Sequence, residues 1–581
     1  MDSSIFLTNF THADWAIVIV YLGATVAKGV WVNRYVGDLS DFIIAGRGLR
    51  IYLAVATMTG TEIGLVTVMY NAQEGFSSGP SAFIIGICWL VGMLVVGLTG
   101  FIIYPLRQFA VMTIPEYYEL RFGRRSRVVG GAILALAGIL NMGLFLQAGA
   151  RFMRGVLGVE SELGLKLLMT IMLGMVLLYT TFGGMVSVVI TDYMQFVVLG
   201  VAMVVGTVWI VMHLGWENIV QAAVEQHGAG AVNPFHEGGY GPWYIVWMIY
   251  MGVAAGSLWA TATTRALAAH SPQTAQRLYK WSSITFLSRV IIPVTWGAAA
   301  LCFITQTPEL TQAFLGEGAP AEAGQYAMPV FFARFFPTGF LGIIAAGMMA
   351  GFMSTHDSYL LCWASVITQD VVAPFYKVGN RGRQVAGIVA GVLGGVVVAG
   401  IVSWAFGRLA PQFAGLIGAV AGVPVALWLA RRIPKVFEGE DLTERGRFIL
   451  TRTLICLIGF FLLFWGLWYE AQMTLWTYMA VTGTIYLSGA FVCIAAGLYW
   501  KGATERGALI ALCGGLLALL GIVPWKDWNV TWVTETSLER FVDPTNLAVI
   551  TIALAAAGML AGSLLWRSKP DAAPADEEAD Q

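Results

Sequence analysis

Long apolar segments recur along almost the whole chain, and they restrict its fold more than any other feature. A helix needs ~20 mostly apolar residues to cross a bilayer. Fifteen runs of this kind are present: 13–33, 51–71, 81–104, 128–150, 163–181, 186–213, 243–263, 282–305, 338–368, 384–407, 411–430, 448–468, 473–499, 505–525 and 545–566. Charged residues make up 12% of the chain, against about 25% in soluble domains. We therefore predict an all-α polytopic membrane protein with about 15 transmembrane helices.

The lysines and arginines predict how these helices are oriented, because cytoplasmic loops retain basic residues. With the N-terminus outside, and with basic residues in the first five positions of a span counted with the adjoining segment, the inner segments hold 24 of the 33 basic residues and the outer segments hold 7. Lys28 and Arg289 lie deeper within predicted spans. This distribution indicates an N-out, C-in topology in the plasma membrane, which is the inner membrane of a bacterium. The net charge of −1 and the lack of a phosphate-binding loop motif argue against nucleic acid and ATP as partners. The expected partners are the lipid bilayer and a small solute.

The second apolar run contains residues that a lipid-facing helix does not tolerate. Residues 56–64 include three threonines, the glycines Gly60 and Gly64, and the carboxylate of Glu62. Each glycine lowers helix preference by roughly 1 kcal/mol, and the broken helices of transporters expose backbone carbonyls to a cavity. We predict a discontinuous helix here. The alternative is close helix packing through the small residues.

Asp192 lies in the sixth run with no basic residue near it in the sequence. A carboxylate inside a membrane needs a compensating charge, so it is a candidate for function. A bound metal ion or a proton would supply that charge. The alternative is an arginine that reaches Asp192 from another helix.

The ninth run places oxygen donors on one side of a helix. Gly351, Ser354, Thr355 and Ser358 follow the i, i+3, i+4, i+7 spacing of a single helical face. Hydroxyl and carbonyl oxygens are the ligands that hard cations prefer, so this face is a candidate sodium site. His356 points to another face, where we expect it to be packed or hydrogen-bonded. Since it cannot serve as a base for the neighbouring hydroxyls, we predict that the protein is not an enzyme.

Short motifs along the chain resemble the sodium/solute symporter family and occur in the family's order. They are Asp38–Phe42 with Ala45–Arg47, Thr113–Tyr117 with Arg121–Gly123, Gly183–Gly184 with Thr191, Asp192 and Gln195, Arg265–Ala269, and Leu498–Thr504. The resemblance implies a LeuT-type fold, in which ten core helices form two inverted five-helix repeats beside accessory helices. It also implies a sodium-coupled symporter that imports a small organic solute by alternating access. A proton-coupled carrier on the same fold and a transporter-like solute sensor are the alternatives.

The same resemblance divides the chain into segments. They are an accessory first helix and inner loop (1–50), a first inverted repeat with core helices one to five (51–213), the start of the second repeat with core helices six to eight (243–377), an inserted helical hairpin (378–447), core helices nine and ten (448–499), C-terminal accessory helices (500–570) and an acidic tail (571–581). The inserted hairpin departs from the family, whose members usually pass directly from core helix eight to core helix nine.

The resemblance further implies ligands for the coupling ion, Na⁺, of which one or two would bind. The first sodium would contact the carbonyls of Ala56, Thr59 and Gly351 and the hydroxyls of Ser354 and Thr355. A possible second sodium would contact Asp192, Asp357 and Ser358, with Ser354 beside them. At Gly60 and Asp357 the chain differs from members that bind two sodium ions, which leaves the number open.

Polar and aromatic residues on three spans are the candidate solute contacts. They are Glu62, Asn71 and Gln73 on the second span, Asn141 and Gln147 on the fourth, and Trp247, Tyr250 and Trp259 on the seventh. Many sugar-transporting members carry an Asn-Gln-Tyr pattern shortly before the arginine of core helix six. Residues 259–264 lack that pattern, which argues against a sugar as the solute.

Overall fold

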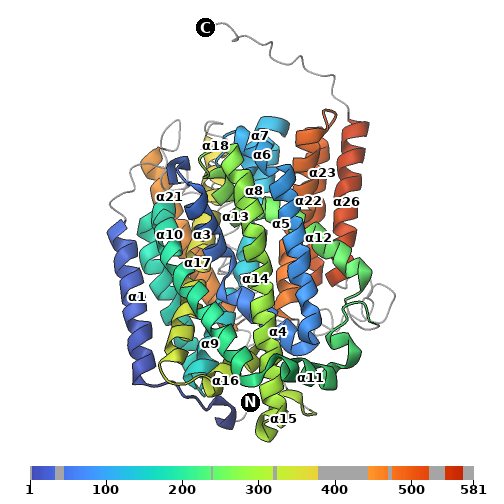
Figure 1. The fold of residues 1–581 in the computed structure, drawn as a ribbon. Coiled ribbons are helices and arrows are strands. Elements are labelled where there is room, and N and C mark those ends of the chain that lie inside the picture. Colours follow the sequence, from blue (N-terminus) through green and yellow to red (C-terminus); the bar gives the residue numbers. More distant parts are fainter. Residues whose placement is uncertain are drawn as a thin grey trace, which may run out of the picture. The chain divides into compact units, whose positions relative to one another are not determined.

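Helices make up nearly all of the structure, which confirms the predicted all-α class (Figure 1). The computed structural model describes residues 3–32, 45–236, 240–317, 319, 323–376, 443–468, 474–522 and 544–566. The chain forms two compact units. The first comprises Met1–Ala364 and Leu454–Gln581, and the second comprises Ser365–Thr453.

The helices follow the apolar runs of the sequence closely. They are α1 (His12–Val32), α3 (Ile51–Glu62), α4 (Leu65–Ser78), α5 (Phe83–Thr99), α6 (Ile103–Gln108), α7 (Ile114–Phe122), α8 (Arg124–Met142), α9 (Phe145–Leu157), α10 (Glu162–Leu214), α11 (Trp216–His227), α12 (Gly241–Leu258), α13 (Ala260–Leu267), α14 (Pro272–Thr305), α15 (Pro308–Leu315), α16 (Ala323–Phe335), α17 (Phe340–Val366), α18 (Ala373–Tyr376), α21 (Glu444–Trp468), α22 (Leu475–Tyr499), α23 (Glu505–Gly514) and α26 (Pro544–Leu565).

Several described helices are suited to a membrane. Seven are long and apolar enough to cross one, or eight if the bent pair α12–α13 counts as one span. Helix α10 is continuous and covers two of the predicted runs, 163–181 and 186–213. The runs 384–407 and 411–430, most of the hairpin predicted at 378–447, and the acidic tail at 571–581 lie outside the described residues. The total of about 15 spans and the N-out, C-in orientation therefore stay predictions.

The second apolar run is broken in the middle, as its glycines and threonines predict. Helix α3 ends at Glu62, Ile63 (φ −94°, ψ 63°) and Gly64 (φ −77°, ψ 160°) are not helical, and α4 begins at Leu65. Gly64 is required by packing, because a Cβ at this position would overlap the Oγ1 of Thr355 on α17. The break therefore lies so close to α17 that Thr355 leaves no room for a side chain at position 64.

A second break separates α12 from α13, and the sequence does not reveal it. Trp259 has an extended backbone (φ −67°, ψ 120°), and the two helices meet at an angle of 49°. Gly256 lies three residues earlier, but no glycine or proline stands at Trp259 itself, and the run 243–263 is predicted as one span. Helix α13 packs against α3, which brings the two broken helices together. Helix ends leave backbone N–H and C=O groups without helical partners, and such ends often form binding sites in transporters.

Helix α14 supports both broken helices from one side. It packs along α4 and α5 and also contacts α3 and α13 (Figure 1). Its contact with α4 is very close, because a Cβ on Gly297 would overlap the carbonyl of Ala72. Small residues allow membrane helices to approach in this manner. The result is a rigid wall on which Arg289 of α14 faces the break after Glu62.

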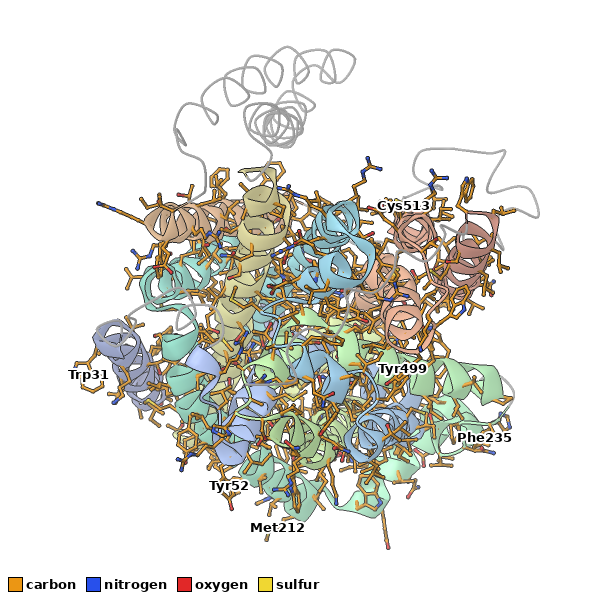
Figure 2. The ribbon with its side chains drawn as sticks, turned by 90° about the horizontal axis from the view of Figure 1, so that it is seen from above. Trp31, Tyr52, Met212, Phe235, Tyr499 and Cys513 are labelled. Atoms are coloured by element: carbon orange, nitrogen blue, oxygen red, sulfur yellow. The ribbon has the colours of Figure 1, made fainter. Side chains whose placement is uncertain are left out.

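The outer surface of the first unit is apolar. Figure 2 shows Trp31, Met212 and Phe235 at its rim, and Met212 is 76% exposed. Valines of α10, among them Val201, Val204 and Val208, are also exposed. A soluble protein rarely exposes an apolar surface of this extent. This surface is suited to lipid tails and agrees with a membrane protein.

The described part of the second unit is small. It contains the last residues of α17, a π-helix from Ile367 to Val372, α18 and the start of α21. The hydroxyl of Thr451 donates a hydrogen bond of 3.0 Å to the hydroxyl of Thr368, and the guanidinium of Arg447 donates one of 2.9 Å to the side-chain oxygen of Gln369. These bonds tie the π-helix to α21.

Candidate ion and solute site

A cluster of oxygen atoms joins α17 to the end of α3. The hydroxyl of Ser354 donates a hydrogen bond of 2.7 Å to the carbonyl of Gly60, and that of Thr355 donates one of 3.0 Å to the carbonyl of Thr61. Both hydroxyls also lie close to the carbonyl of Gly351, at 3.3 and 3.0 Å. Two hydroxyl and three carbonyl oxygens thus converge at a buried point. Oxygen sets of this kind bind hard cations such as sodium.

The predicted ligands of the first sodium are only partly drawn together by these contacts. Gly351, Ser354 and Thr355 lie in the cluster. Ala56 and Thr59 are buried on α3, Ala56 about one turn before Gly60 and Thr59 directly before it. The carbonyl of Thr59 accepts the N–H of Ile63 at 2.9 Å. The hydroxyls contact Gly60 and Thr61 instead, and the sequence reasoning missed these two residues. The break was the available signal, because the last carbonyls of a helix lack partners.

Asp192 is paired with an arginine, Arg265 of α13. Its Oδ2 lies 3.2 Å from Nη2 of Arg265 and accepts hydrogen bonds from Thr57 at 2.6 Å and Thr61 at 3.1 Å. Nη2 also donates to the hydroxyls of Thr61 at 2.7 Å and Ser358 at 2.6 Å. The interpretation that the protein supplies no cation to Asp192 is therefore wrong, and the alternative of an arginine from another helix is confirmed. The bend between α12 and α13 brings Arg265 to this position.

The remaining acidic and basic candidates of α17 lie beside this network. Asp357 is fully buried, and its Oδ1 accepts a hydrogen bond of 3.2 Å from Ser358. His356 lies on another face, where its Nδ1 is 2.8 Å from the carbonyl of Phe352 and its ring packs against Phe352 and Phe145. His356 is thus a packed and hydrogen-bonded side chain, as the sequence predicts.

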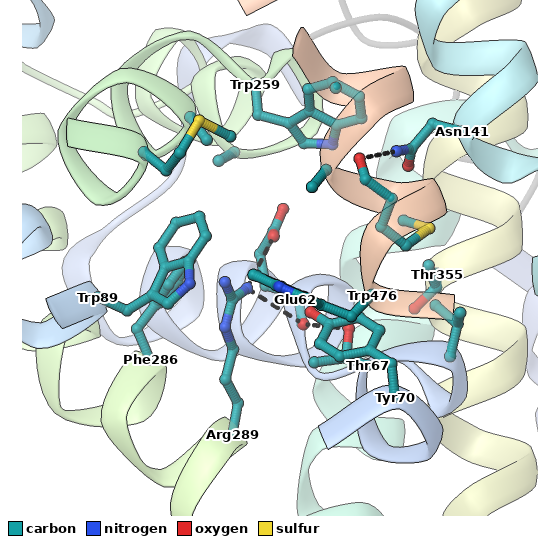
Figure 3. A pocket seen from close by; sticks show the side chains of 18 of the residues that line it. Glu62, Thr67, Tyr70, Trp89, Asn141, Trp259, Phe286, Arg289, Thr355 and Trp476 are labelled. Carbon is teal, nitrogen blue, oxygen red and sulfur yellow. Dashed lines mark hydrogen bonds and ion pairs between the residues drawn. The ribbon is translucent and has the colours of Figure 1, made fainter. Parts of the chain in front are cut away.

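A cavity of about 100 Å³ lies next to the break between α3 and α4 (Figure 3). Both broken helices, α14, α17 and α22 contribute to its walls. Large aromatic side chains line much of it: Tyr70, Trp89, Trp247, Trp259, Phe286 and Trp476. Thr61 and Thr355 line the cavity and also belong to the oxygen cluster. The cavity and the cluster therefore share a wall.

The predicted solute contacts divide into two groups. Those that line the cavity are Glu62, Asn141, Trp247 and Trp259. Those outside its lining are Asn71, Gln73, Gln147 and Tyr250. Among the latter, the amide of Asn71 donates to the carbonyls of Thr67 and Arg289, at 2.8 and 3.3 Å, so it holds α4 to α14.

Glu62 and Arg289 are the two charged residues among the described residues that line the cavity. Nη1 of Arg289 lies 3.3 Å from Oε2 of Glu62, and the hydroxyl of Thr261 donates a hydrogen bond of 2.9 Å to Oε1. Figure 3 shows Arg289 reaching toward Glu62 with Trp89 and Phe286 beside it. Arg289 falls within a predicted span but is not among the predicted site residues. Its position in an apolar run was the signal, because intramembrane ionisable residues usually serve a function.

Two broken helices that meet at a cavity, with an oxygen cluster in its wall, are typical of ion-coupled secondary transporters. The sequence model of the sodium:solute symporter family matches residues 42–430. The chain belongs to this family, and it is therefore a sodium/solute symporter integral to a membrane. The family consists of transporters rather than enzymes.

Several characterised proteins are similar in sequence. A sodium/glucose cotransporter of Vibrio parahaemolyticus is 26% identical over 483 residues, which are 73% of this chain and 87% of the relative. Sodium/glucose cotransporter 1 of Mus musculus is 24% identical over 68% of this chain and 62% of its own length. The osmoregulated proline transporter OpuE of Bacillus subtilis is 23% identical over 62% of this chain and 70% of its own length. Relatives at this distance differ in the solutes for which they are named.

One solved structure has a similar fold along nearly the whole chain. It is the substrate-bound, outward-open state of a Na⁺-coupled sialic acid symporter, with a TM-score of 0.68 and 14% sequence identity. The match covers 96% of this chain and 98% of that protein. At such low identity the likeness concerns the fold.

Proposed function

We propose that this protein imports a small organic solute together with sodium by alternating access. The observation that carries the proposal is that the oxygen cluster and the cavity share a wall. Thr61 and Thr355 belong to the cluster and also line the cavity. A cation bound by the cluster oxygens would hold α17 to the break in α3–α4. Glu62, which directly follows Thr61, lines the cavity, so the ion would also fix one of its walls.

Coupling follows from this arrangement by linkage. If sodium favours the conformation in which the cavity walls are assembled, it raises the affinity for solute, and solute raises the affinity for sodium by the same factor. Opening toward a compartment with little sodium releases the ion, which separates α17 from α3 and lets the solute leave. A membrane potential of 100 mV contributes ~2.3 kcal/mol for each charge that crosses with the ion.

We propose a stoichiometry of one sodium. The first site would use the cluster of Gly60, Thr61, Gly351, Ser354 and Thr355, together with Ala56 and Thr59 from the family resemblance. The second predicted site, at Asp192, Asp357 and Ser358, is next to the guanidinium of Arg265. That fixed cation occupies the electrostatic role of a second ion and repels one.

The arrangement of breaks supports the two inverted repeats implied by the family resemblance. The first repeat, proposed for 51–213, begins with the broken pair α3–α4, and the second, beginning at 243, starts with the broken pair α12–α13. Corresponding discontinuous helices in two halves are typical of transporters whose solute binds near the middle of the membrane. We propose the plasma membrane as the location, the inner membrane in a bacterial cell.

The first experiment measures sodium binding without a known solute. Thermal unfolding of the purified full-length protein is followed in sodium chloride and in choline chloride at equal ionic strength. We expect sodium to stabilise the protein. Thr355→Val should weaken the apparent sodium affinity roughly tenfold or more, because it removes one oxygen ligand, and a polar contact to a charged group contributes about 1.5–3 kcal/mol. Thr170→Val is the matched control, because the Thr170 hydroxyl is exposed and bonds to its own helix at Lys166.

The second experiment measures transport in proteoliposomes. A panel of solutes is screened with an inward sodium gradient, with an inward proton gradient and with neither. Uptake that requires sodium supports the proposal. Uptake driven by protons and unaffected by sodium would contradict it, as would an equal sodium affinity in Thr355→Val and the parent protein.

A further inference from the structure

The ion pair in the cavity leaves much of the hydrogen-bonding capacity of Arg289 unused. A guanidinium has five N–H donors, yet Arg289 approaches the Glu62 carboxylate through Nη1, at 3.3 Å. Its Nε is buried without a hydrogen-bond partner among the described residues. The ring centroids of Trp89 and Phe286 lie 4.4 and 4.0 Å from the guanidinium carbon, so the two rings hold the orientation of the guanidinium. The guanidinium is thus fixed in place where it lines the cavity, and Glu62 uses only one of its nitrogens.

Glu62 is likewise only partly satisfied. Its Oε1 accepts the hydroxyl of Thr261, and its Oε2 is shared with Arg289. A carboxylate has about four lone-pair positions for donors. The side chains of both charged residues are at most 10% exposed, so unfilled positions on either residue carry a desolvation penalty that a polar ligand would remove.

The pairing of opposite charges selects for the charge type of the solute. A solute with a single negative charge would bind Arg289 but place its charge next to Glu62, and a singly positive solute would face the opposite problem with Arg289. Either one leaves a buried charge of the protein uncompensated. A zwitterion offers each residue a partner of opposite sign at the same time, and the net charge of the cavity does not change.

The size and walls of the cavity limit the rest of the solute. Its volume of about 100 Å³ is smaller than the ~150 Å³ of an engineered protein cavity that holds one benzene molecule. Apart from the charged pair, Met251, Ala255 and Leu487 join the aromatic residues in its walls. A short apolar side chain fits these walls, whereas the many hydroxyls of a hexose would need polar partners there.

We propose that the solute is a small zwitterion of the α-amino acid type with a short apolar side chain, whose carboxylate binds Arg289 and whose ammonium group binds Glu62. The proposal rests on the symport function proposed above. It extends that function by naming the chemical class of solute, and it assigns solute recognition to Arg289.

Binding of matched probes to the full-length protein in sodium chloride tests the proposal. The zwitterions are glycine and L-alanine, which match the size of the cavity. Their carboxamides serve as cations, their N-acetyl derivatives serve as anions, and D-glucose is the neutral polyol. Calorimetry or tryptophan fluorescence reports the affinities. We expect at least one zwitterion to bind on the order of a hundredfold more tightly than its amide and its N-acetyl derivative. Equal affinities within a set, or preference for glucose, would overturn the proposal.

Two substitutions separate solute recognition from a merely structural role of the pair. Glu62→Gln should shift the preference toward N-acetyl derivatives, because Arg289 keeps its charge, and Arg289→Gln should shift it toward the carboxamides. Glu74→Gln is the control: Glu74 is on the same helix as Tyr70, bonds to Tyr240 and does not line the cavity, so the preference should stay with the zwitterions. A uniform loss of all probes in both cavity variants would show a structural role and contradict the proposal.

Sodium binding, measured by thermal unfolding on the same samples, distinguishes this proposal from the more general one. If sodium stabilises the protein and no zwitterion binds, the solute class is wrong and sodium coupling stands. If sodium has no effect, the symport function itself is contradicted.

Discussion

Replacing Arg265 with methionine would remove the guanidinium that faces Asp192 inside the bundle. Both side chains are buried, with exposures of 1% and 0%. Removing one partner of a buried ion pair costs about 3–5 kcal/mol, because the other charge stays buried without compensation. The lost bonds from Arg265 to Thr61 and Ser358 add little, since these two hydroxyls lie 3.0 Å apart and can bond to each other. We expect the unfolding equilibrium to shift by roughly two to four orders of magnitude.

The double variant Asp192→Asn/Arg265→Met provides the decisive comparison. Replacing a whole buried ion pair with neutral side chains of similar size is often close to neutral for stability, so most of the loss should be recovered. Reversible unfolding in mixed detergent micelles, followed by tryptophan fluorescence, measures both effects. The reasoning is refuted if Arg265→Met is as stable as the parent protein, or if the double variant is no more stable than Arg265→Met.

The same variant tests the proposed stoichiometry. Without the guanidinium, the buried carboxylate of Asp192 has no positive partner, so a bound cation would be favoured beside it. We expect sodium to stabilise Arg265→Met more steeply than the parent protein, with a Hill coefficient that rises from near 1 toward 2. A parent protein that already binds two sodium ions would contradict the assignment of Arg265 to the second cation position.

Three further predictions concern packing, hydrogen bonding and topology. Gly64→Ala should destabilise the protein by about 1–3 kcal/mol in micelle unfolding, because the new Cβ would overlap Thr355, whereas Gly174→Ala has open space around its Cβ and should not. Tyr359→Phe should cost about 1–3 kcal/mol by leaving the indole N–H of Trp259, now 2.8 Å from the Tyr359 hydroxyl, buried without that acceptor; an unchanged stability would show that another acceptor replaces it. An impermeant label should reach a C-terminal tag only in membranes whose cytoplasmic side is exposed, and labelling from the outside would contradict the C-in orientation.

The two breaks show how far local sequence patterns predict this fold. Gly60, Gly64 and the threonines weaken the second span locally, and the helix indeed ends at Glu62. Gly256 and three threonines also flank Trp259, but the extended backbone at Trp259 itself is held by tertiary contacts, including its bond to Tyr359 and packing against Trp363. Contacts of that kind depend on residues about a hundred positions away in the sequence, which no local rule can identify.

The candidate ion site was predicted in part for the same reason. The spacing of Gly351, Ser354 and Thr355 on one helix face follows from helical periodicity, and the structure places these three residues together. The carbonyls that they meet belong to Gly60 and Thr61, which depends on where α3 ends and how closely α17 approaches. Both the end of α3 and the approach of α17 are determined by packing between helices.

The sequence by itself determined that this protein lies in a membrane, that it is helical and to which family it belongs. Whether a segment of ~20 residues enters lipid as a helix depends on the apolar character of its own residues and not on distant parts of the chain. The tertiary structure decided the charge pairing, because Asp192 meets Arg265 over a separation of 73 residues and Glu62 meets Arg289 over 227. A buried charge is stabilised by whichever opposite charge the packing brings within a few ångströms. For this reason the scarce charged residues of the sequence could be recognised as functional, while their partners became visible only in the folded chain.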